Sequence, residues 1–122
     1  MDIENVVTLF CTLSKQASGD RAKFFDIING AYLSVVSRLK KDVTQYTDDE
    51  TDELEYACAC IAYYDFTVIS LTRESRVVTE TGSYKFDYTA DMRIKAAALL
   101  KNMAIKNIAG LITDDEFLFA SI

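Results

Sequence analysis

Residues 47–73 read TDDETDELEYACACIAYYDFTVISLTR, and this stretch decides the fold. It begins with a capping box, because Thr47 is followed three residues later by Glu50. Four more acids place negative charge near the helix-start amides that favour it: Asp48, Asp49, Asp52 and Glu53. The apolar residues then recur largely at three- and four-residue steps: Leu54, Ala57, Cys58, Ile61, Ala62, Val68 and Ile69. That spacing predicts a helix that buries one face, and it indicates packing and assembly ahead of catalysis.

The composition favours helices in the rest of the chain. The chain has 122 residues, half of them apolar, with no Pro and only four Gly. This length suits one domain with a real core, so we expect a single domain over residues 1–122. Because Pro and Gly are the usual chain breakers, their scarcity favours long helices over a sheet with many turns. We therefore expect a mostly α fold.

Two helices are expected before the decisive stretch. Asp2 is suited to cap a short first helix that ends before residues 17–20. Asp20 is suited to cap a second helix, and its last turn would hold cations that complement the helix dipole: Arg38, Lys40 and Lys41. Gly30 inside this helix costs about 1 kcal/mol relative to Ala. It marks either the close approach of a neighbour or a tolerated weak point.

A β-hairpin is expected at residues 77–88, VVTETGSYKFDY. β-branched residues lead to a Thr-Gly-Ser turn, after which Tyr84, Phe86 and Tyr88 alternate with polar residues. An isolated hairpin is marginal in water, so it must pack on the helices or pair with another subunit. Thr89 would then cap a last helix from Ala90 to about Leu111. The predicted fold is a small four-helix bundle, three long helices plus one short, with the hairpin before the last helix.

The last helix is apolar over most of its circumference. One side carries Met92, Ala96, Leu99, Leu100, Met103, Ala104 and Leu111, and the arc extends towards the other side through Ile94, Ala98, Ile105, Ala109 and Ile112. One small core cannot easily use both sets, so this helix is either central or half covered by a partner. The closing TDDEFLFASI is apolar again, and it either packs on its own core or docks on a neighbouring subunit.

Residues that carry out chemistry are scarce. The chain has no His, which is the commonest general base and metal ligand. Cys11, Cys58 and Cys60 fall among apolar residues, where a thiol stays protonated. Cys58 and Cys60 lie roughly 200° apart around a helix, so neither a disulfide between them nor a shared metal site is expected. The single, scattered glycines form no phosphate-binding loop. We expect no enzyme activity, no cofactor and no metal.

The charge is strongly acidic and unevenly distributed. A net charge of −6 makes the chain a poor general binder of nucleic acid. Eight acids and no Lys or Arg lie from Asp42 to Asp65, and many basic residues follow later: Arg73, Arg76, Lys85, Arg93, Lys95, Lys101 and Lys106. This asymmetry suits head-to-tail association between copies, with ordinary surface charge as the other interpretation. The start has no basic signal region and no apolar run reaches roughly 20 residues, so we expect a soluble protein without a membrane span.

The order of these features resembles the small head-tail connector, or head-completion, proteins of tailed bacteriophages and prophages. The matching residues are the helix body from Glu53 to Asp65 after an acidic start, and the Phe-rich end from Glu116 to Phe119. The resemblance implies a structural virion protein whose copies form a ring between portal and tail, extending the DNA channel and completing the head. Its partners would be itself, the portal, and other connector or tail proteins. It would occupy the host cytoplasm during assembly and then the head-tail junction. DNA would pass through it without sequence-specific binding.

A ring needs two different surfaces on each copy. We expect the subunit interface to use Tyr84, Phe86, Tyr88, Ile94, Ile105, Phe117, Phe119 and Ile122. An acidic face that repels phosphates and lets DNA slide is expected at Asp48, Asp49, Glu50, Asp52, Glu53 and Glu55. The alternative function is a small helical regulatory protein that binds nucleic acid or a protein partner through its last helix. Because Arg93 and Lys101 fall on the apolar side of that helix, it makes a poor phosphate-binding stripe.

Overall fold

A computed structural model describes the backbone of residues 1–80 and 88–113, and the side chains of residues 1–71 and 89–113. The elements are α1 (Ile3–Ser14), η1 (Ser18–Lys23), α2 (Phe25–Val36), η2 (Val43–Gln45), α3 (Asp48–Glu80) and α4 (Tyr88–Ile108). The predicted mostly α fold is confirmed for these residues. Two of the α-helices are long and two are short, since α3 has 33 residues and α4 has 21, while α1 and α2 have 12 each.

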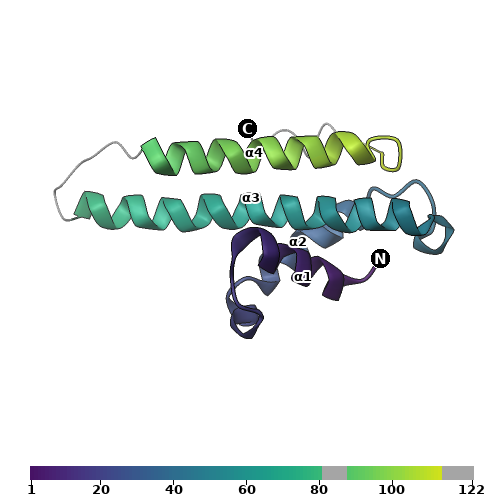
Figure 1. Cartoon of the computed structure of the whole chain (residues 1–122), viewed down its shortest axis with the longest axis horizontal. Helices are drawn as coiled ribbons and strands as arrows, with labels where there is room; N and C mark the ends of the chain where they lie inside the picture. Colours follow the sequence, from purple (N-terminus) through teal and green to yellow (C-terminus); the bar gives the residue numbers. More distant parts are fainter. Residues whose placement is uncertain (81–87, 114–122) are drawn as a thin grey trace.

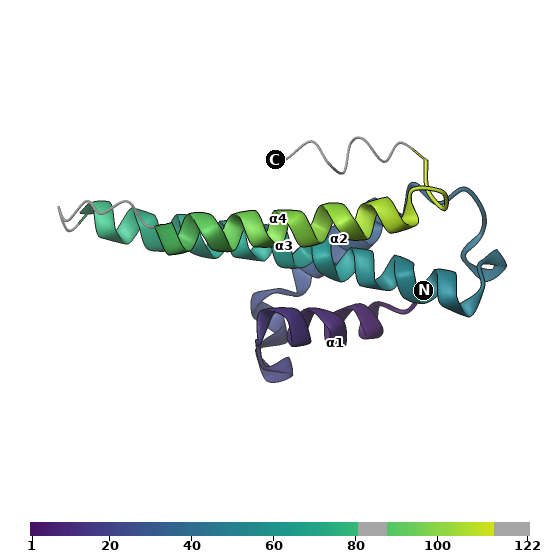
Figure 2. The ribbon, with the colours of Figure 1, turned by 45° about the horizontal axis from the view of Figure 1, so that its top comes forward.

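The helix α3 is the centre of the packing. Figures 1 and 2 show α4 running antiparallel along α3, while α1 and α2 lie against another side of α3. Six consecutive residues of α3 are buried, from Ala57 to Ala62. Because a helix turns once in about 3.6 residues, such a run is enclosed on every side. Five of the six are Ala or Cys, whose small side chains let the neighbouring helices come close. The sequence predicted one buried face here, and the tertiary structure buries the whole circumference.

The start of α3 confirms the predicted capping box. The backbone N–H of Thr47 donates to Oε1 of Glu50 at 2.9 Å, and the backbone N–H of Glu50 donates to Oγ1 of Thr47 at 3.1 Å. The hydrogen bond from Thr47 lowers the pKa of the Glu50 carboxyl. Each side chain thus satisfies a helix-start donor that has no partner within the helix.

The predicted β-hairpin finds no support. Residues 77–80, expected as its first strand, continue α3 to Glu80, and Tyr88, expected in its second strand, begins α4. Tyr84 and Phe86 lie outside the described residues. The physical reason is that β-branched residues cost a helix only about 0.7 kcal/mol each or less, whereas extending an existing helix adds one hydrogen bond per residue. Thr89 therefore lies inside α4 and does not cap it.

The first helix begins as predicted, and its apolar stripe packs on the other helices. The Asp2 side chain accepts the N–H of Glu4 at 2.9 Å, which is the expected N-cap. Phe10 is fully buried, and its ring centroid lies 4.8 Å from that of Phe24 and 5.4 Å from that of Phe66. These three aromatic rings join α1, the start of α2 and α3 into one core.

The second helix differs from its prediction at both ends. Asp20 lies within η1 and does not cap α2, which begins at Phe25 without a side-chain cap. The helix ends at Val36, so Arg38, Lys40 and Lys41 follow it and do not form its last turn. A Cβ placed on Gly30 would meet nothing within 4 Å. Among the described residues of this chain, no neighbour therefore approaches Gly30 closely.

Tyr46 joins the segment that follows α2 to the segment that follows α4. Its buried hydroxyl accepts the N–H groups of Lys40 and Lys41 at 3.1 and 3.3 Å, and donates to the carbonyl of Leu111 at 2.8 Å. The N–H of Thr113 donates to the carbonyl of Arg38 at 2.7 Å beside it. This hydrogen-bond group ties the end of α4 to the segment after α2.

Replacing Tyr46 with Phe should lower the free energy of unfolding by about 1–3 kcal/mol, because three backbone groups lose a hydrogen-bond partner while the ring remains. Urea denaturation measures the loss. Tyr63→Phe removes the same oxygen from a half-buried ring and should cost less than about 0.5 kcal/mol. Equal losses in the two variants would argue against the hydrogen-bond group at Tyr46.

Within the described residues, the segment Asp48–Leu71 of α3 is long and apolar enough to cross a membrane. Most of its apolar window, 61%, is buried inside the fold. A core helix passes the same length and composition test, so the segment is explained by its central position.

Candidate functional site

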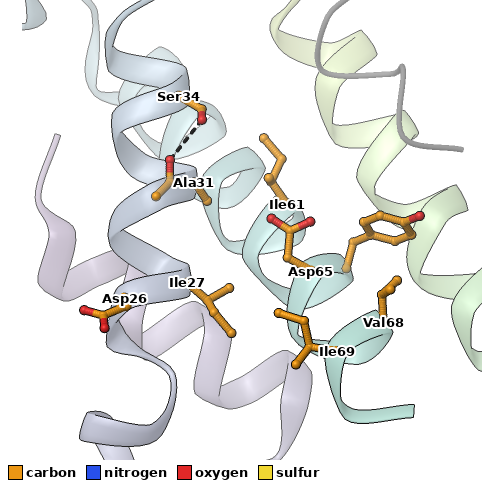
Figure 3. Close-up of a pocket in the computed structure, with 10 residues that line it drawn as sticks. Asp26, Ile27, Ala31, Ser34, Ile61, Asp65, Val68 and Ile69 are labelled. Atoms are coloured by element: carbon orange, nitrogen blue, oxygen red, sulfur yellow. Dashed lines mark hydrogen bonds between the residues drawn. The ribbon is translucent and has the colours of Figure 1, made fainter. Parts of the chain in front are cut away.

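An open groove lies between α2 and α3. It has a volume of about 430 Å³ and is lined by Asp26, Ile27, Gly30, Ala31, Ser34, Ile61, Tyr64, Asp65, Val68 and Ile69. Figure 3 shows Ile27 of α2 and Ile69 of α3 facing one another, with Asp65 beside them and Asp26 extending from the other side of α2. Ile69 is 40% exposed although the sequence predicts it as a core position. The groove can therefore hold an apolar side chain or helix ridge, and its charged residues are both acids.

Tyr64, which lines the groove, contacts a buried ammonium group. Lys101 of α4 is only 3% exposed, and its Nζ lies 4.5 Å from the centroid of the Tyr64 ring. Burial lowers the pKa of Lys101, and the nearby Asp65 carboxylate opposes that change. Burial likewise raises the pKa of Asp65, and the Lys101 ammonium opposes it. Attraction between the two groups and the contact with the aromatic face stabilise the ammonium where water is largely excluded.

The outer side of α4 carries an exposed apolar stripe, which we define as Met92, Ala96, Leu99 and Met103. The three large residues are 67%, 62% and 55% exposed, respectively. The stripe lies roughly 200° around the helix from the side that packs on α3, which contains Ala97, Lys101, Ala104, Ile105 and Ile108. Of the two apolar sides predicted for this helix, the fold uses the one with Ile105 and leaves the one with Leu99 facing outwards.

The residues predicted to form the subunit interface do not lie on this stripe. Ile105 is fully buried in the core of its own chain, so it offers no surface to a neighbouring subunit in this conformation. Ile94 is half-buried and packs against Tyr64, Ala97 and Ala98. The side chain of Tyr88 is not described, and five predicted residues lie outside the described ranges: Tyr84, Phe86, Phe117, Phe119 and Ile122. The sequence reasoning described two apolar sides of this helix and chose Ile94 and Ile105 for the interface, so it missed the exposed residues Met92, Leu99 and Met103.

The six residues of the predicted acidic face differ in exposure. Asp48, Asp49, Asp52 and Glu53 are exposed and Glu50 is half-buried. Glu55 is 3% exposed, and its Oε2 accepts the backbone N–H of Asp2. The Asn5 side-chain amide also lies 3.4 Å from both oxygens of this carboxylate. Glu55 therefore fixes the N-terminus against α3 and takes no part in an acidic surface.

The described cysteines are free thiols, and two of them are chemically protected. Cys58 and Cys60 are both fully buried on α3. Burial raises the pKa of both thiols, to about 11 for Cys60. A thiol that stays protonated is a poor nucleophile and a poor metal ligand. In the described part of the chain, no cluster of His, Cys, Asp or Glu is arranged to hold a metal ion.

These thiols predict a loss of stability in alkaline solution. The thiols titrate near pH 9 in the unfolded chain and only near pH 11 at Cys60 in the folded one, so the unfolded state binds fewer protons between these values. Stability should then fall as the pH rises from 9 to 11, by about 1.4 kcal/mol per pH unit for one thiol. Urea titrations across this range measure the slope. Cys60→Ala should flatten it relative to the native chain, and an unchanged slope would contradict the assignment.

Comparisons of the chain with protein-family models, with curated proteins and with solved structures found no significant match. Among the described residues, two surfaces stand out on this chain, the groove and the stripe. The Ser34 hydroxyl in the groove donates to the carbonyl of Gly30 at 2.9 Å, and both surfaces present apolar side chains beside charged ones. Exposed apolar surface of this kind marks sites of interaction with proteins, membranes or ligands.

Proposed function

We propose that this protein is a structural, non-enzymatic subunit that assembles as a ring between the portal and the tail of a tailed bacteriophage or prophage. In that position it extends the DNA channel and completes the head. The resemblance of the helix body at residues 53–65 and of the Phe-rich end supports the phage part of the proposal. The exposed apolar stripe on α4 is the observation that supports the assembly part.

The stripe supports assembly because its position is costly for a chain that stays alone. Three large apolar side chains stand on the solvent side of one helix, at steps of seven and four residues. Contiguous apolar surface of this kind marks interaction sites more often than chance exposure, and it is removed from water when a partner covers it. An assembling subunit gives these residues a role that an isolated monomer does not.

The exposed acids at the start of α3 also fit a DNA conduit. Asp48, Asp49, Asp52 and Glu53 add to a net charge of −6. Carboxylates on a channel wall repel phosphates and keep the duplex from binding as it moves. The charge therefore suits passage of DNA and opposes its retention.

The alternative function, a regulatory protein that binds nucleic acid through α4, has less support. Of the four basic residues of that helix, Lys101 is buried and Lys95 pairs with Asp91 at 2.9 Å. Duplex binding depends on several cations that reach phosphates together. The outer side of α4 is mainly apolar, so it fits a protein surface better than a nucleic-acid backbone.

Two measurements test the proposed function. The first is to sequence several kilobases of DNA on either side of the gene, where genes for a portal, a capsid protein and tail components are expected. The second is to co-express the chain with that portal and to image the complexes by electron microscopy, where a ring on the portal is expected. Metabolic or regulatory neighbours, or a portal that never binds this chain, would overturn the proposal.

A further inference from the structure

The two surfaces found on this chain are complementary in their chemistry. The stripe on α4 is apolar and has basic neighbours on the same helix, with Lys95 and Lys106 on one side and Arg93 towards the other. The groove has an apolar floor, and its charged residues are Asp26 and Asp65. Two of these charges have partners in their own chain, because Lys95 pairs with Asp91 and Asp65 faces Lys101. The charges left for a contact between copies are Arg93 and Lys106 beside the stripe and Asp26 at the groove. Such pairing brings the right surfaces together and disfavours wrong ones.

The stripe is long enough to span the groove. The groove extends from Asp26 to Ser34 along α2 and from Ile61 to Ile69 along α3, which is about 12 Å on each helix at 1.5 Å per residue. The stripe from Met92 to Met103 covers about 17 Å by the same rise. A helix that carries such a stripe can therefore fill the whole groove with two or three of its large side chains.

The stripe cannot fill the groove of its own chain. The groove includes α3, whereas the stripe lies on the side of α4 that faces away from α3. We propose that the α4 stripe of one copy docks in the α2–α3 groove of a second copy. This inference rests on the proposed ring assembly and deepens it, because it names the two surfaces that meet.

The proposed contact has the symmetry that a ring requires. Each copy uses the stripe towards one neighbour and the groove towards the other, so the interface is heterologous and closes when the rotation per copy divides a full turn. Gly30 gains a role in this arrangement. Its position in the groove has open space where a Cβ would lie, so the absent side chain leaves room for the partner helix.

Cysteine cross-linking tests the contact in the full-length chain. Ile69→Cys places a thiol at the groove, and Leu99→Cys places one on the stripe, each in a Cys11→Ser background that removes the half-buried native thiol. The two variants are purified separately, mixed at high concentration, oxidised with copper phenanthroline and separated on a non-reducing gel. We expect the mixed dimer to form about tenfold faster than either variant alone forms its own dimer, because the docked thiols are held close.

A matched pair controls for random collision. Leu33→Cys lies on α2 outside the groove lining and is as exposed as the stripe residues, at 54%. Its mixture with Leu99→Cys should cross-link at the slow collision rate. Equal rates for the two mixtures would overturn the proposal. If the mixed dimer appeared only after residues 114–122 were removed, the occupant of the groove would be the chain's own tail, and the proposal would equally fail.

A second variant separates docking from folding. Gly30→Leu replaces a poor helix residue where nothing obstructs a side chain, so the melting temperature of the monomer should rise by a few degrees. The same side chain obstructs the groove, so cross-linking of a Gly30→Leu/Ile69→Cys chain to Leu99→Cys should slow about tenfold. Gly19→Leu adds the same bulk within η1, outside the groove lining, where a Cβ also meets nothing within 4 Å, and it should leave cross-linking unchanged. Cross-linking that resists Gly30→Leu would contradict docking in the groove.

The outcomes also separate this inference from the proposed function. Rings on the portal without the mixed cross-link would leave the connector proposal standing and overturn the stripe-in-groove contact. A specific cross-link in a chain whose gene neighbours are metabolic would support the contact and overturn the phage assignment.

Discussion

Replacing Phe10 with Ala should lower the free energy of unfolding by about 3–5 kcal/mol, because the ring is fully buried and removal leaves a cavity. The variant also loses the ring contacts to Phe24 and Phe66, which are worth about 0.5–1.5 kcal/mol each beyond burial. Since a domain is stable by only about 5–15 kcal/mol, we expect a fall in melting temperature of roughly 10 °C or more. Thermal unfolding followed by circular dichroism at 222 nm measures it.

The control for this variant is Leu33→Ala. Leu33 is 54% exposed on α2, so the same kind of truncation removes few contacts and should change stability by less than about 0.5 kcal/mol. If Phe10→Ala were as mild as this control, α1 would not be packed on α3 in solution, and the arrangement of the first two helices would be wrong.

Replacing Lys101 with Glu should cost about 3–5 kcal/mol at neutral pH, which is the range for a buried charge left without compensation. The change removes the ammonium from the Tyr64 ring and places a second carboxylate near Asp65. Burial and mutual repulsion raise the pKa of both carboxyls above their unfolded values. The variant should therefore approach the native chain in stability near pH 4, and the deficit should grow as the pH rises through the folded pKa values.

A double replacement is the matched control for the buried charge. Lys101→Met with Asp65→Asn removes both charges and keeps similar volumes, so its stability should stay within about 1 kcal/mol of the native chain. Urea denaturation at pH 4 and pH 7 distinguishes the two cases. A Lys101→Glu chain with native stability at pH 7 would mean that position 101 is exposed to solvent. The packing of α4 on α3 would then need revision.

Local signals predicted the helix starts that depend on neighbouring residues. The Asp2 cap and the box of Thr47 with Glu50 form within a few residues of each other in sequence, and both were found. The same reasoning failed at Asp20 and at residues 77–80. At these positions the alternative local structures differ by only fractions of a kcal/mol per residue. The preference of the local sequence is therefore outweighed by the continuation of α3 at residues 77–80, and by the packing of the Phe24 ring at the start of α2.

The candidate site was predictable only in part. The excess of apolar surface on the last helix is evident from its residues, but the choice of face is not. Ile105 and Leu99 are both large and apolar, yet one is fully buried and the other is 62% exposed. The groove could not be expected, because Ile27 and Ile69 come from helices that are far apart in the chain and meet only when α2 lies beside α3.

The sequence by itself determined the helical class, the caps at Asp2 and Thr47, and the absence of His as a general base or metal ligand. These properties depend on composition and on residues within one helical turn, so no tertiary contact is needed to establish them. Only the tertiary structure decided that α3 is enclosed, that Glu55 is buried while its acidic neighbours are exposed, and that Met92, Leu99 and Met103 face outwards. Burial is a property of which helices meet, and a helix with two apolar sides can present either one until its partner is in place.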